Sequence, residues 1–194
     1  MTPATLPCAP YICSAGACKT SCASNADCQG PTYVCTGTTC GSATMVSVQL
    51  AARELSPNNA AIMPDFKLYN TGTTPVPLSE LTLRYWFTRD TAIAQTAWCD
   101  FATIGAANIT LTFAAVSPAR TNADYYLQVG FAPASGNLAP GANTGNIQTR
   151  FSKDDFSNYN EANDYSYVAS MSFGVTTKVT VDRLGNLVYG TAPP

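Results

Sequence analysis

Apolar and polar residues alternate in several short stretches of the chain after residue 44. These stretches are 46–50, 81–88, 109–113, 125–131, 147–151 and 179–181. A period of two is typical of β-strands that bury one face, and no stretch keeps the 3.6-residue period of an amphipathic helix. Turn-forming sequences separate the stretches at 70–72, 137–141 and 185–186. The pattern predicts an all-β sandwich or jelly roll.

The alternation also assigns side chains to the two faces of each strand. In the stretch that ends at residue 151, the odd-numbered residues are predicted to face the core, so Gln148 and Arg150 would face outward. The same reasoning places Arg84, Trp86 and Tyr126 on outward faces. An outward aromatic ring beside Arg or Gln indicates either a binding surface or a ring that covers a sheet edge or packs under a loop.

Cysteines divide the chain in two. Seven of the eight lie in the first 40 residues, at positions 8, 13, 18, 22, 28, 35 and 40, and Cys99 stands alone. The first stretch has too few large apolar residues for a core, so we expect disulfides and an oxidising, extracellular setting. A zinc site would favour Cys-x-x-Cys pairs, which are absent. Because seven is odd, one cysteine pairs with Cys99, pairs outside the chain or stays free.

The change in pattern near residues 41–44 indicates a domain boundary. We expect a disulfide-stapled segment at 1–43 and a strand-rich domain at 44–194. The first residues lack the basic and apolar regions of a signal peptide, so any signal peptide is expected to be absent already. The role of the first segment stays open between a spacer, a linker cap and a second binding knob.

Composition narrows the function. Charged residues make up 11% of the chain and the net charge is −2, with no run of Lys or Arg, which argues against nucleic acid as a partner. No apolar stretch approaches the roughly 18 residues that cross a membrane. The chain has no histidine, which excludes most zinc hydrolases, copper oxidases and Ser-His-Asp hydrolases. An uncharged polar surface suits a neutral, hydroxylated ligand such as a glycan.

Several stretches of the chain resemble a known family. They are PDFKLYNTG (64–72), LTLRYWFTRD (81–90), AWCD (97–100), ADYYL (123–127), NIQTRF (146–151) and DFSNYNEANDY (155–165). From Val46 to Pro193 the chain is similar to a family 3 carbohydrate-binding module, the cellulose-binding type attached to bacterial cellulases and scaffold proteins. Residues 1–43 resemble the short Cys-rich segments of secreted myxobacterial proteins.

The resemblance implies a fold and a function. The expected fold is a jelly-roll β-sandwich of about nine strands with one structural calcium ion. The expected function is that of a secreted, non-catalytic module, which anchors a parent glycoside hydrolase to cellulose or a related β-glucan. A catalytic domain elsewhere in a longer chain would be its partner.

The resemblance also implies roles for residues at matching positions. The cellulose-binding strip corresponds to Asp100, Phe101, Arg150 and Phe156, with Gln148 as a flanking polar anchor. In the family, the Asp and Arg form a flat ion pair that stacks like a ring. The calcium ligands correspond to Thr88, Asp90, Asn160, Asn163 and Asp164. A groove on the second face corresponds to Arg84, Trp86, Tyr126 and Tyr165.

The strip departs from the pattern of the strongest binders. Phe156 stands where they carry Trp, Phe101 stands where they carry His or Trp, and an inserted Tyr is missing between Ile104 and Ile109. We therefore expect a shortened strip with a moderate grip on cellulose. The alternative is a degenerate or helper module, which guides single glucan chains to an adjacent catalytic domain without binding crystals. Likewise, the Asn-rich turn is either a calcium loop or a turn without metal.

An enzyme is the rival class of protein. A glycosidase needs two carboxylates that face each other across a cleft at about 5–10 Å. The candidate carboxylates crowd one loop, at Asp154, Asp155, Glu161 and Asp164. We therefore expect no catalytic residues in this chain.

Overall fold

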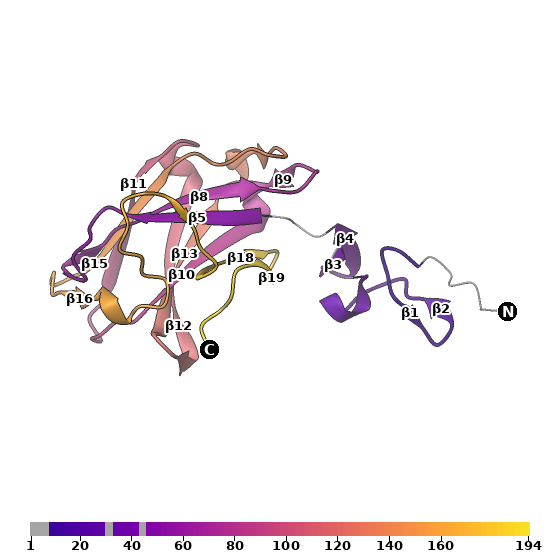
Figure 1. The fold of residues 1–194 in the computed structure, drawn as a ribbon, viewed down its shortest axis with the longest axis horizontal. Coiled ribbons are helices and arrows are strands. Elements are labelled where there is room, and N and C mark those ends of the chain that lie inside the picture. The colour runs from indigo at the N-terminus through magenta and orange to yellow at the C-terminus, as the bar shows by residue number, and fades with distance from the viewer. Residues whose placement is uncertain (1–7, 30–32, 43–45) are drawn as a thin grey trace.

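The structure is a computed structural model that describes residues 8–29, 33–42 and 46–194 (Figure 1). The expected boundary between residues 43 and 44 lies outside the described residues. Among the described residues, no helix is long and apolar enough to cross a membrane. The helical turns are η1 (Asn25–Asp27), η2 (Leu78–Glu80), η3 (Ala106–Asn108), η4 (Pro133–Ser135) and η5 (Glu161–Asn163).

Two antiparallel sheets form the strand-rich domain, which we call the β-domain. The five-stranded sheet has the order β12 (Ile109–Arg120), β13 (Ala123–Phe131), β10 (Leu81–Phe87), β18 (Val179–Arg183) and β19 (Asn186–Tyr189). The six-stranded sheet has the order β11 (Gln95–Ala102), β15 (Ile147–Lys153), β8 (Pro64–Asn70), β5 (Val46–Ala52) and β17 (Gly174–Val175), with β7 (Ala61–Ile62) beside β15. Shorter pairs join β14 (Asn137–Leu138) to β9 (Val76–Pro77) and β16 (Tyr159–Asn160) to β6 (Asn58–Asn59).

The inner faces of the two sheets share one apolar core. Phe66 of β8 contacts Tyr85 of β10 edge to face, with 6.3 Å between the ring centroids. Phe87 of β10 and Phe151 of β15 lie closer, at 4.8 Å. All four rings are buried, and such aromatic contacts stabilise a core beyond the burial of area. Figure 1 shows the two sheets as overlapping layers, with β5 and β8 in front of β10 and β13.

The alternating pattern located most of the longer strands. In the two sheets of the described residues, nine strands have four or more residues, as expected for the jelly roll. Alternation did not locate β8 or β11. In β8, Phe66 and Leu68 face the core and Asp65 and Lys67 lie on the opposite face, where Asp65 is also buried. In β11, the register shifts between Cys99 and Phe101, which interrupts the period of two.

A two-residue turn joins β18 to β19. Arg183 pairs with Asn186, so the turn consists of Leu184 and Gly185, one residue earlier than predicted. Both turn residues have positive φ, at 49° and 83°. This conformation matches the twist of the two paired strands, and it favours a glycine at the second position.

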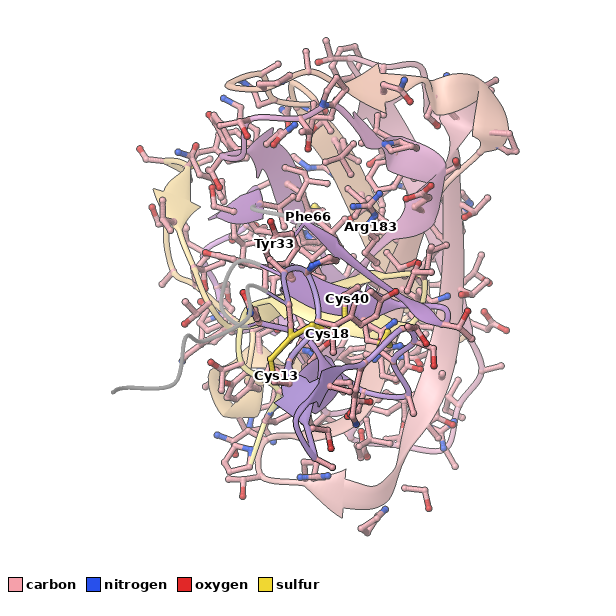
Figure 2. The ribbon with its side chains drawn as sticks, turned by 90° about the vertical axis from the view of Figure 1, so that its right-hand side faces the viewer. Cys13, Cys18, Tyr33, Cys40, Phe66 and Arg183 are labelled. Carbon is pink, nitrogen blue, oxygen red and sulfur yellow. A yellow bond between two sulfur atoms is a disulfide. The ribbon has the colours of Figure 1, made fainter. Side chains whose placement is uncertain are left out.

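The N-terminal segment is held by disulfides, as predicted. It contains two hairpins, β1 (Cys13–Ser14) with β2 (Ala17–Cys18) and β3 (Tyr33–Thr36) with β4 (Thr39–Ser42). Disulfides join Cys22 to Cys35 and Cys28 to Cys40, and these four sulfur-bearing residues form the buried cluster of the segment. Figure 2 labels Cys13, Cys18, Tyr33 and Cys40, and draws the disulfides in yellow.

The sulfur of Cys8 lies at bonding distance from the sulfurs of both Cys13 and Cys18. Because one sulfur holds one disulfide bond, only one of these two pairs can form in a given molecule. Cys99 lies far along the chain in β11 and is the free cysteine of the described residues. Pairing of the odd cysteine with Cys99, one of the three alternatives, is therefore not found.

Truncation of one core ring tests the assignment of Phe151 to the buried inner face of its sheet. Phe151→Ala is expected to lower the free energy of unfolding by about 3–5 kcal/mol, because a fully buried ring leaves a cavity. Phe156→Ala is the matched control: its ring is 66% exposed, so the change should stay below about 0.5 kcal/mol. Urea unfolding followed by circular dichroism measures both values. Equal losses for the two variants would contradict the assignment.

Candidate functional site

A row of outward side chains follows β11 and β15 at the edge of the six-stranded sheet. Trp98 pairs with Arg150, and Phe101 pairs with Gln148. Between these two pairs β11 contains one extra residue, Asp100, so the strand has a bulge at this point. The bulge decides the orientation of Phe101. In a regular strand, Asp100 and Phe101 would face opposite sides of the sheet.

The bulge brings both side chains to the outer face. Cys99, before it, packs against the core, and Ala102, after it, is buried. Phe101 is 49% exposed, although it stands only one residue from Ala102. The ring of Phe101 therefore faces outward, on the same side of the sheet as Asp100.

The carboxylate of Asp100 lies between two arginines. Arg150 donates from Nε to Oδ1 at 2.8 Å, and Arg53 donates from Nη2 to Oδ2 at 3.0 Å. The guanidinium of Arg150 in turn lies over the ring of Trp98, 4.4 Å from its centroid. A ring, a guanidinium and a carboxylate are thus in contact along one stretch of the outer face.

Phe156 lies in the turn that follows β15, the strand that carries Gln148 and Arg150 of this row. The turn that carries it is held against the start of β11, because Asp154 accepts a hydrogen bond from the Thr96 hydroxyl at 2.9 Å. The backbone of Phe156 has a φ of 55°, and its ring is 66% exposed. We call the whole row the β11–β15 platform; its members are Trp98, Asp100, Phe101, Gln148, Arg150 and Phe156.

Opposing effects set the acidity of the two carboxyls near the platform. Partial burial works to raise the pKa of Asp100, but hydrogen bonds and charge from Arg150 and Arg53 outweigh it and hold that pKa below its ordinary value. Burial raises the pKa of Asp65 above its ordinary value, against the opposing effect of Arg53. Asp100 is therefore ionised at neutral pH, and its ion pair with Arg150 persists in weak acid.

Two residues of this region were not singled out from the sequence. Trp98 stands two residues before Asp100, so the period of two was a usable signal for its outward face. Arg53 gave no such signal, because 47 residues separate it from Asp100 and only the tertiary fold brings the two together. The predicted strip residues Asp100, Gln148 and Arg150 all lie on the same outer face.

A second group of polar side chains gathers at the end of β10 and around η5. The Thr88 hydroxyl lies 2.8 Å from Oδ1 of Asn163 and 2.7 Å from Oδ1 of Asp164. Asp90 accepts a hydrogen bond from the backbone N–H of Asn160 at 2.8 Å. The five predicted calcium ligands thus occupy two loops that are linked by hydrogen bonds.

This oxygen-rich group fits a hard cation. The Thr88 hydroxyl has one proton for two neighbouring oxygens, and the buried Oδ2 of Asp164 has no hydrogen-bond partner. Burial raises the pKa of Asp164 to about 7, although Thr88 donates to it and works in the other direction. A divalent cation that prefers carboxylate, amide and hydroxyl oxygens, as Ca²⁺ does, would compensate this unpaired carboxylate.

The predicted second-face residues lie on the outer side of the five-stranded sheet. Arg84 forms an ion pair with Asp182 at 2.7 Å, and its guanidinium lies 4.9 Å from the centroid of the Tyr126 ring. Trp86 packs against Tyr126 and donates from its indole N–H to the Thr180 hydroxyl at 3.1 Å.

The aromatic rings of this face are largely covered. Trp86 is only 7% exposed: its ring faces away from the core, as the alternation predicts, but it is packed under its neighbours. Tyr165 lies next to Ser166, which hydrogen-bonds to the Trp86 backbone, and its own hydroxyl donates to the Thr191 carbonyl at 3.1 Å. Arg84, Trp86 and Tyr126 therefore form a packed cluster, and Tyr165 is linked to it along the chain through Ser166.

Comparisons with known proteins find relatives of the β-domain. The model of the family described as "Cellulose binding domain" matches residues 47–190. The chain is 45% identical over 149 residues to the Beta-mannanase/endoglucanase A of Caldicellulosiruptor saccharolyticus, and the matched region covers 76% of this chain and 11% of that protein. It is 42% identical over 142 residues to the Cellulosomal-scaffolding protein A of Acetivibrio thermocellus, and the matched region covers 69% of this chain and 8% of that protein. The chain thus spans about a tenth of the length of these relatives.

Solved structures agree with this match. The CBM3b of the major scaffoldin subunit ScaA from Acetivibrio cellulolyticus has a TM-score of 0.75 and 37% identity, over 79% of this chain and 100% of that one. A family IIIa CBD from Clostridium cellulolyticum has a TM-score of 0.72 and 37% identity, over 79% of this chain and 100% of that one. The jelly-roll expectation for the β-domain is confirmed. The resemblance of residues 1–43 to myxobacterial segments stays a prediction.

The two tryptophans of the chain offer a test of the two faces. Trp86→Phe leaves only the half-buried Trp98, and Trp98→Phe leaves only the covered Trp86. Because acrylamide must reach the ring to quench it, the Trp86→Phe variant is expected to show the stronger quenching. Stern–Volmer plots of the two variants measure this difference. The reverse order would contradict the faces described above.

Proposed function

The chain belongs to the family of cellulose-binding domains, and from this membership we propose that its β-domain anchors a larger protein to cellulose. The observation that carries the proposal is the β11–β15 platform. It brings the exposed ring of Phe101 to the same outer face as the Asp100–Arg150 ion pair, and the exposed ring of Phe156 lies in the turn that follows β15. Crystalline cellulose presents flat faces of glucose rings with axial C–H groups, on which planar side chains stack.

The energies of these contacts favour a moderate affinity for cellulose. Each ring stacked on a sugar contributes about 1 kcal/mol beyond the burial of area, and such contacts sum when they engage together. The partly exposed ion pair contributes only about 0–1 kcal/mol to folding. We infer that its value lies instead in the flat shape that such a pair has in this family. Phe supplies less stacking area than Trp would, which supports affinity below that of Trp-bearing strips.

Exposure of the platform also separates the two candidate roles. A helper module that guides single glucan chains has no need of accessible rings on a broad sheet face. Here the two phenylalanines of the platform are 49% and 66% exposed, whereas Trp86 on the second face is covered. This contrast favours anchoring to a surface over guidance of a single chain along the second face.

The proposed setting is extracellular and non-catalytic. The disulfides of the N-terminal segment suit an oxidising compartment. Two of the four carboxylates that crowd the loop after β15 accept local hydrogen bonds: Asp154 from Thr96, and Asp155 from the hydroxyl and N–H of Ser157. Because the chain spans only a small part of its curated relatives, we place the catalytic partner in another part of a longer protein.

We further propose that Thr88, Asp90, Asn160, Asn163 and Asp164 hold one structural calcium ion. The unpartnered, buried Oδ2 of Asp164 is the support for this site. Calcium would compensate the negative charge of this carboxylate. It would also link η5 to the end of β10. The side chains themselves orient the site, because the Thr88 N–H and hydroxyl hold Asp164 in place.

Adsorption tests the proposed function. The chain is expected to leave solution when mixed with microcrystalline cellulose. Arg150→Ala and Phe156→Ala should each weaken binding about 5–10-fold, and the double variant about 30–100-fold, if each contact contributes about 1 kcal/mol or slightly more. Depletion isotherms give these values. Leu187→Ala, on β19 of the other sheet and 47% exposed, is the matched control and should bind as the wild type does. A wild-type chain that stays in the supernatant would refute the proposal.

Removal of metal tests the calcium site. A chelator is expected to lower the melting temperature, and added Ca²⁺ should restore it, because a ligand that binds only the folded state stabilises it. The Asp164→Asn variant should melt at the same temperature with Ca²⁺ and with chelator. Differential scanning calorimetry makes the measurement. A wild-type melting temperature that does not respond to the chelator would count against the site.

A further inference from the structure

Four charged side chains of alternating sign form a continuous line at the β11–β15 platform. The line runs from Asp65 to Arg53, then to Asp100 and finally to Arg150. Each link is a hydrogen-bonded ion pair of 2.8 to 3.0 Å. One end of the line lies in the sheet, at the buried Asp65, and the other end lies on the outer face.

Arg53 is held by atoms that belong to the rigid part of the fold. Its Nε donates to Oδ1 of Asp65 at 2.9 Å, and Asp65 is only 5% exposed. Its Nη2 donates to the Thr149 carbonyl of β15 at 2.6 Å. Thr149 is itself fully buried and donates its hydroxyl to the Pro64 carbonyl of β8. The guanidinium therefore has fixed partners on two neighbouring strands.

Asp100, by contrast, needs help to keep its orientation. It is the extra residue of the bulge, and the terminal torsion of an Asp side chain has a broad, soft potential. A single partner would leave the carboxylate free to rotate about that partner. Arg150 and Arg53 bind different oxygens, so together they fix the plane of the carboxylate.

Stability is a poor explanation for this line of charges. Burial of Asp65 costs solvation energy, and its raised pKa reflects that cost despite the opposing charge of Arg53. The partly exposed links contribute little to stability. Geometry is the better explanation, because the guanidinium fork of Arg53 joins the buried Asp65, the strand carbonyl and the platform carboxylate at defined angles.

We propose that Arg53 is a positioning residue for cellulose binding, which transmits the rigidity of β8 and β15 to Asp100 and so keeps the Asp100–Arg150 pair planar against the glucan. This inference rests on the proposed function, since it concerns the same platform. Arg53 acts on the ligand through Asp100. Removal of Arg53 lets the Asp100 carboxylate rotate out of the plane in which the Asp100–Arg150 pair stacks on the glucan.

Adsorption isotherms of the full chain on microcrystalline cellulose test the coupling. Arg53→Gln and Asp100→Asn are each expected to weaken binding about 5-fold. The double variant should bind within about twofold of Asp100→Asn alone, because a residue that acts through Asp100 has no effect once the carboxylate is gone. Arg183→Gln is the matched control: it removes an arginine of similar exposure that pairs with Glu80 on the other sheet, and should bind as the wild type.

The outcomes are distinguishable. Wild-type affinity in Arg53→Gln, or multiplied losses of about 25-fold in the double variant, would overturn the inference while the proposed function stands. A wild-type chain that does not bind would refute the proposed function itself. If Arg53→Gln does not fold, Arg53→Lys replaces it: Lys keeps the charge but lacks the fork, so it should also weaken binding. Wild-type affinity in Arg53→Lys would equally overturn the inference.

Discussion

Contact between the aromatic rings of the two sheets is the interaction on which the rest of the molecule depends. Phe66 and Phe151 from one sheet interlock with Tyr85 and Phe87 from the other, and the apolar burial there orients every strand that contributes to it. Once the inner face is fixed, the side-chain period of two fixes the outer face as well. The platform is therefore a consequence of the core.

One exception to that period gives the platform its chemistry. The bulge in β11 shifts the register by one residue, so that Asp100 and Phe101, neighbours in sequence, share the outer face. A regular edge strand would present one of them at most. Because Asp100 has no regular place in the ladder, its orientation depends on the two arginines, and through Arg53 on the buried side chain of Asp65.

The two parts of the chain keep their structure by different means. The β-domain has a large apolar core, and a hydrogen bond between Thr88 and Asp164 joins two of its loops. The N-terminal segment buries mainly cysteines, with Tyr11 and Tyr33 packed against them. Small segments without an apolar core depend on such crosslinks, which suits conditions outside the cell.

The sequence by itself determined the all-β class, six of the strands, the disulfide-held segment and the outward direction of Gln148 and Arg150. These features follow from local periodicity and composition, which need no knowledge of distant contacts. Only the tertiary structure decided that Phe101 faces outward, that Trp86 is covered and that Arg53 joins the platform. Each of these depends on strand register or on residues far apart in the chain. A bulge moves all later side chains of the strand by one position, and an ion pair between residues 47 positions apart produces no local sequence pattern.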